Sequence, residues 1–135
     1  MTPPDSEFEL PNEDLLLDLD RLHAIAMCPA KALPDARLRR LIEREVRQLH
    51  GVLQRHFEAE EEGRYMGAVL DRVPDLNDTV ERLHAQHSEI TTRLLSLASD
   101  CKTGALDELR DRAAALLDLI GEHERDEVKL VEKAR

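Results

Sequence analysis

The stretch from Leu106 to Val131 constrains the fold most, because apolar residues recur in it alternately three and four positions apart. Residues with this spacing share one face of an α-helix. The face begins with five apolar residues: Leu106, Leu109, Ala113, Leu116 and Ile120. It continues through His123 and Glu127 to Leu130. A polar side chain on a buried face costs free energy unless a partner satisfies it. This histidine and glutamate therefore indicate a polar partner inside the core, and a metal ion is the leading candidate.

Three earlier segments show the same helical periodicity. The first follows Asn12, a suitable N-terminal cap, and ends before Pro29. Its expected face is Leu16, Leu19, His23 and Ala26. The second starts at Asp35, and its face is Leu38, Ile42, Glu45 or Val46, Leu49, Val52 or Leu53, His56 and Glu60. The third follows Pro74, and its face is Val80, Leu83, His87, Ile90, Leu94 and Leu97.

Four helical segments with short connections predict an all-α fold, an antiparallel up-down four-helix bundle. No stretch has the alternating pattern of a β-strand. Residues 1–11 contain three prolines among acidic residues, and we expect them to form an irregular N-terminal leader. Residues 12–135 then form the helical domain.

Composition narrows the range of partners. The formal net charge is −10 and the basic residues are not clustered, which argues against nucleic acid and anionic membrane surfaces as partners. No apolar run approaches the roughly 20 residues that span a bilayer, and the N-terminus lacks the pattern of a secretory signal. The two cysteines form no CxxC motif and are typical of reduced thiols. We therefore expect a cytoplasmic protein.

Histidine and glutamate recur at one helical spacing on two of these faces. Glu60 follows His56 by four positions, and Glu127 follows His123 by four, so each pair projects from one side of its helix. The second and fourth helices of an up-down bundle run in the same direction, so the two pairs can meet at one level, with His23 and His87 facing them. Imidazole and carboxylate together suit iron, manganese, zinc or nickel. One such pair could arise by chance, and a single core histidine is more often structural. Agreement among three helices favours a metal site, with room for two ions bridged by carboxylates.

The segment LQRHFEAEEEGRYMGAVL resembles the second-helix signature of hemerythrin-like, HHE cation-binding domains. LHAQHSEITTRLLSL is similar to their third helix, and LLDLIGEHERDEVKL to their fourth. The resemblance covers about residues 36–131. It implies a four-helix bundle holding two non-haem iron ions, with zinc or manganese as alternatives, and a role in binding dioxygen or in sensing oxygen, redox state or iron. It also implies the metal ligands His56, Glu60, His87, His123 and Glu127.

The chain departs from the oxygen-carrying members of that family at two places. Those carriers have HxxxH in the third helix, whereas here Leu83 and Thr91 lie four positions from His87. The carriers also have a histidine followed five positions later by aspartate in the fourth helix, where this chain has Val128. His84 is an alternative ligand in the third helix. The departures favour the histidine–glutamate form of bacterial and iron-sensing members over a dedicated oxygen carrier.

The first helix offers one candidate ligand, and its position along the bundle is restricted. His23 is its candidate, but only twelve residues connect His23 to Asp35, and the second helix extends about 33 Å from Asp35 to the metal level. Two alternative functions therefore stay open. One is a metal-free helical interaction module. The other is a ferritin-like di-iron oxidase, for which Glu81-x-x-His84 is the one matching motif. The leading interpretation is a binding or sensing protein, not an enzyme.

Overall fold

The computed structural model describes residues 13–29, 31–61 and 65–134, and these are helical with short connections. The four long helices are α1 (Glu13–Ala26), α2 (Asp35–Glu61), α4 (Asn77–Asp100) and α5 (Leu106–Ala134). The all-α four-helix prediction is confirmed. The short helix α3 (Tyr65–Arg72) and the 3₁₀ turn η2 (Pro74–Leu76) were not expected as separate elements. The expected leader, 1–11, and the expected cap Asn12 lie outside the described residues.

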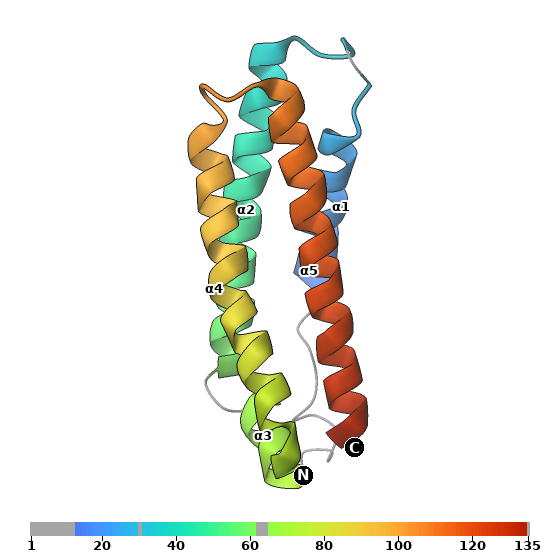
Figure 1. Cartoon of the computed structure of the whole chain (residues 1–135). Helices are drawn as coiled ribbons and strands as arrows, with labels where there is room; N and C mark the ends of the chain where they lie inside the picture. Colours follow the sequence, from blue (N-terminus) through green and yellow to red (C-terminus); the bar gives the residue numbers. More distant parts are fainter. Residues whose placement is uncertain (1–12, 30, 62–64, 135) are drawn as a thin grey trace.

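The long helices pack in a ring. α1 lies against α2 and α5, and α4 lies against the same two helices from the other side. Figure 1 shows that α2 and α5 run in the same direction while α1 and α4 run in the opposite one, as an up-down bundle requires. The described part of α1 lies beside only part of the length of α5 (Figure 1). None of the described helices combines the length and the apolar character that crossing a membrane would need.

At the end of the bundle where α1 ends and α5 begins, two arginines donate hydrogen bonds to backbone carbonyls at the helix ends and connections. Arg110 of α5 donates hydrogen bonds to the carbonyl of Ala26, at 3.0 Å from Nε, and to that of Cys28. Arg39 of α2 donates to the carbonyl of Cys101, at 3.2 Å. Cys28 and Cys101 are both free thiols. Because Arg110 joins α5 to the end of α1, it fixes where α1 ends along α5.

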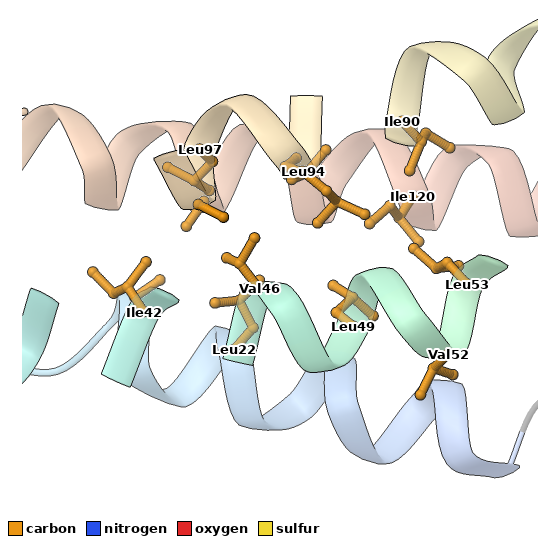
Figure 2. Packing of buried hydrophobic residues seen from close by; sticks show 14 of the residues in the cluster. Leu22, Ile42, Val46, Leu49, Val52, Leu53, Ile90, Leu94, Leu97 and Ile120 are labelled. Atoms are coloured by element: carbon orange, nitrogen blue, oxygen red, sulfur yellow. The ribbon is translucent and has the colours of Figure 1, made fainter. Parts of the chain in front are cut away.

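Two apolar clusters fill the core, one toward each end of the bundle. The larger cluster joins all four long helices (Figure 2) and includes Leu22, Ile42, Val46, Leu49, Leu53, Ile90, Leu94, Leu97 and Ile120. The smaller one joins α3, α4 and α5 and comprises Met66, Val69, Val80, Leu83, Leu130, Val131 and Ala134. On α4, His87 falls between Leu83 of the smaller cluster and Ile90 of the larger. The polar residues of the predicted stripes therefore form a layer between two apolar ones.

The expected face of the first helix is right at Ala26 and wrong at Leu16 and His23. Its buried residues are Leu15, Asp18, Leu22 and Ala26. Leu16 and His23 are exposed, and Leu19 is half-buried. Leucines occupy positions 15, 16 and 17 in a row, so the sequence allows two faces, and packing against α2 and α5 selects the one that buries Leu15 and Leu22.

Candidate metal centre

Five of the six predicted ligands converge in the polar layer between the two apolar clusters. Each is at most 4% exposed, although each carries an ionisable group. They come from three helices and are His56 and Glu60 of α2, His87 of α4, and His123 and Glu127 of α5. Ionisable side chains buried to this extent need compensating partners, because desolvation of a charged group is costly.

Glu60 lies between two imidazoles from different helices. Its Oε1 is 2.6 Å from Nε2 of His56, and its Oε2 is 3.3 Å from Nε2 of His87. The second predicted pair has the same internal geometry, with Nε2 of His123 at 2.6 Å from Oε1 of Glu127. Carboxylate oxygens and imidazole nitrogens thus point toward one another across the bundle axis.

Glu124 is a further member of the layer that the sequence reasoning missed. Its Oε1 lies 3.3 Å from Nε2 of His56, and its side chain is 18% exposed. The signal was present, because Glu124 precedes Glu127 by three positions and follows Ile120 by four, which places all three toward one side of α5.

The donor atoms form two groups that each could hold a metal ion. One group is Glu60, His87, His123 and Glu127, and the other is His56, Glu124 and Glu127. Within each group the donor atoms lie within 4.8 Å of one another. Since Glu127 belongs to both, the arrangement offers two ion positions that share a carboxylate.

The donor atoms fit a cation better than they fit one another. Both oxygens of Glu60, Nε2 of His123 and Oε1 of Glu124 are buried and make no well-directed hydrogen bond with a described residue. Buried polar atoms without such a hydrogen bond are rare in folded proteins. Besides the close contacts within each pair, donor atoms of different helices lie within 4.8 Å of one another in each group. A metal ion within each group would satisfy the lone pairs.

The pKa values of both members of the α2 pair, His56 and Glu60, are shifted strongly. Burial disfavours the charged imidazole of His56, but its contacts with the carboxylates of Glu124 and Glu60 outweigh burial and raise its pKa to about 10. Burial likewise disfavours the charged form of Glu60, yet contacts with His56 and His87 prevail and lower its pKa to about 2. Without metal, this pair is therefore a buried imidazolium and carboxylate.

The α5 pair behaves in the opposite way. Burial, together with contact with Glu60 and the negative charges of Glu60 and Glu124, raises the pKa of Glu127 to about 12. Burial, with the neighbouring His87, lowers the pKa of His123 to about 4. Without metal, Glu127 thus keeps its proton and His123 is neutral. Because metal ligands must be deprotonated, a bound ion would replace the protons on Glu127 and His56.

Two neighbours orient the imidazoles. The side-chain oxygen of Gln86 is 2.7 Å from Nδ1 of His123 and can only accept a hydrogen bond, so Nδ1 is the donor and the Nε2 lone pair is directed at the carboxylates. The ring of Phe57 stacks on His87 with centroids 3.9 Å apart and planes 7° apart. Both residues hold a ligand in place without belonging to either donor group.

The structure does not bring His23 to this layer. His23 is exposed and belongs to neither donor group. Arg110, whose side chain holds the end of α1, precedes His123 by thirteen residues, or about 20 Å of helix. His23 therefore lies far from the metal level. The alternative, His84, is exposed on α4 and is also outside both groups.

A comparison with protein-family models gives a match to the hemerythrin HHE cation-binding domain over residues 7–134, nearly the whole chain. The chain belongs to the hemerythrin HHE family. A search of curated proteins and a search of solved structures each return no match. A hemerythrin HHE domain is described as cation-binding, and the buried histidine–glutamate layer of this member is the part of the described chain that could hold a metal.

Proposed function

We propose that this protein binds two non-haem iron ions through His56, Glu60, His87, His123 and Glu127, and that it binds dioxygen or senses oxygen, iron or redox state in the cytoplasm. One observation carries the proposal. Imidazole nitrogens and carboxylate oxygens from three helices converge, buried, on two points that share Glu127. Metal-free, this layer buries ionisable groups in the core, and both oxygens of Glu60 make no well-directed hydrogen bond with a described residue.

The chemistry of the proposed ligands supports iron as the bound metal. Mixed imidazole and carboxylate ligation suits iron, while zinc and manganese are the alternatives that such donors also accept. When bound, iron would supply redox chemistry and a coordination position for a small ligand. The protein's own contribution is to fix the ligands. Gln86 holds the tautomer of His123, and the stacked ring of Phe57 shields His87 from one side.

A cavity of about 330 Å³ between α2 and α4 supports access by a small molecule. His87 and Phe57 line it together with polar residues: Gln54, Glu58, Ser88, Thr91 and Thr92. Thr91, like Leu83, lies four positions from His87, where an oxygen-carrying hemerythrin would have a second histidine. With one imidazole fewer on α4, we favour a sensing role over dedicated oxygen carriage.

The test is the metal content of the purified protein, with an absorption spectrum after anaerobic iron loading and exposure to air. We expect about two iron ions per chain and near-ultraviolet charge-transfer absorption that appears with oxygen. His123→Ala should lose both signals, while His84→Ala, the matched change at an exposed histidine of α4, should keep them. Retention of less than one ion per chain, without charge-transfer absorption, would contradict the proposal.

The metal-free helical module is the second candidate, and the absence of a donor from the described part of α1 is the observation that favours it. Its signature would be a melting temperature unaffected by iron or chelator. The ferritin-like oxidase has no such support, because Glu81 and His84 are both exposed on α4.

A further inference from the structure

The two donor groups differ in chemical composition. The first combines two imidazoles, of His87 and His123, with the carboxylates of Glu60 and Glu127. The second has the imidazole of His56 and otherwise carboxylates, from Glu124 and Glu127. Oε1 of Glu60, 2.6 Å from His56, adds a further carboxylate oxygen beside the second group. The first group is thus half nitrogen, whereas the second is dominated by oxygen.

On the side of the second group that faces α1, the donor residue comes from α5. No described residue of α1 belongs to either group, and the buried acid of α1, Asp18, lies 3.5 Å from Arg21 of its own helix. Glu124 instead lines a cavity of about 540 Å³ together with Leu15 and Leu19 of α1. Its Oε1 is buried and not satisfied by a well-directed hydrogen bond, although the rest of the side chain reaches the surface.

We propose that Glu124 is a metal ligand, supplying from α5 the contact that α1 does not make, and that it renders the two metal positions unequal. This inference rests on the proposed function, since it assigns a ligand to one of the two ions. The position at His56, Glu124 and Glu127 is the weaker and more exchangeable of the two, and it favours a harder ion such as Mn²⁺ relative to the first position.

Ligand chemistry sets the direction of this difference. Imidazole suits zinc and iron, whereas carboxylate oxygens suit manganese and magnesium. The members of the first group are each at most 4% exposed, but Glu124 is 18% exposed at the side chain. An ion in the second position therefore lies nearer to solvent, and it should be the first to leave on dilution or chelation.

The experiment is an anaerobic titration of the metal-free full chain with Mn²⁺ alone, with free Mn²⁺ followed by electron paramagnetic resonance. The wild type should bind two ions with clearly separated affinities. Glu124→Gln removes the charge and keeps the shape, so it should weaken the second ion by about 100-fold or more, because losing even an outer-shell partner costs 10–100-fold. The first ion should change by less than about tenfold. Glu122→Gln, the same change at an exposed position of α5, should leave both ions unchanged.

A second variant keeps the test independent of whether Glu124→Gln folds. Glu124→His replaces the oxygen donor with a nitrogen donor, and it should retain two ions while shifting the preference of the second position from Mn²⁺ toward Zn²⁺ in a competition titration. The outcomes separate the two proposals. Two ions with equal affinities in the wild type, or two unaltered ions in Glu124→Gln, would overturn the role of Glu124 and leave the proposed function standing. A wild type that binds no metal, iron included, would overturn the proposed function itself.

Discussion

Two regions of this bundle use the same helical faces but are held together by different interactions. On α2, Ile42 and Leu49 pack in the larger apolar cluster, and His56 and Glu60 continue the same face into the polar layer. The apolar region is stabilised by burial itself, at about 25 cal/mol per Å². The polar layer instead buries ionisable groups, and both oxygens of Glu60 there make no well-directed hydrogen bond with a described residue. The comparison indicates that the apolar region sets the register of the helices and so positions the polar layer, which a bound metal would stabilise.

The largest expected change in stability comes from the apolar region. Leu49 is fully buried, so Leu49→Ala should lower the free energy of unfolding by about 2–5 kcal/mol. Because Leu49 lies two turns from His56, the number of bound metal ions should not change while the protein is folded. Urea denaturation of the metal-free protein measures the first quantity, and metal analysis measures the second. Leu95→Ala, at an exposed leucine of α4, is the control and should cost less than about 0.5 kcal/mol. Loss of metal in folded Leu49→Ala would mean that metal binding in the polar layer depends on the packing of the apolar region.

Metal removal tests the polar layer alone. An ion that binds only the folded state stabilises it by about 4 kcal/mol when its free concentration is 1,000 times its Kd. For a domain of this size the corresponding drop in melting temperature on chelation is on the order of 10 °C. Scanning calorimetry with and without iron, under anaerobic conditions, measures it. If the melting temperature stays the same, the layer is stable without metal and the distinction between the two regions fails.

The orientation of His123 provides a smaller test within the polar layer. Gln86→Leu removes the oxygen that accepts the Nδ1 proton, and it should weaken metal binding by about 10–100-fold, or 1.4–2.7 kcal/mol. Gln86→Glu keeps an acceptor at that place and should restore most of the affinity. Gln48→Leu, at an exposed position of α2, is the matched control. Equal affinities for Gln86→Leu and the wild type would show that packing alone holds the ring.

Sequence reasoning succeeded where one helical face was unambiguous. On α4 and α5 the apolar residues on both sides of His87 and His123 allow a single face, so their burial followed directly from spacing. It failed for α1, where consecutive leucines permit two faces and only packing against α2 and α5 decides between them. It also missed Glu124: its spacing from Ile120 and Glu127 places it toward the same side of α5, but only the assembled bundle shows that its side chain reaches His56. The eight-residue α3 is too short for periodicity to separate it from the end of α2.

The smallest expected effect concerns His23, the predicted ligand that the structure places outside the polar layer. Its side chain is exposed on α1, beside the apolar region and not at the metal level. His23→Ala should therefore change the free energy of unfolding by less than about 0.5 kcal/mol, and it should leave the number and affinity of bound metal ions unchanged. His56→Ala, which removes a buried imidazole that contacts both Glu60 and Glu124, is the contrasting variant and should lose the second ion. Parallel iron titrations of the two variants make the measurement. Loss of an ion in His23→Ala would mean that α1 moves toward the polar layer. His23 would then contribute to metal binding, and the apolar region and the polar layer would not be separate.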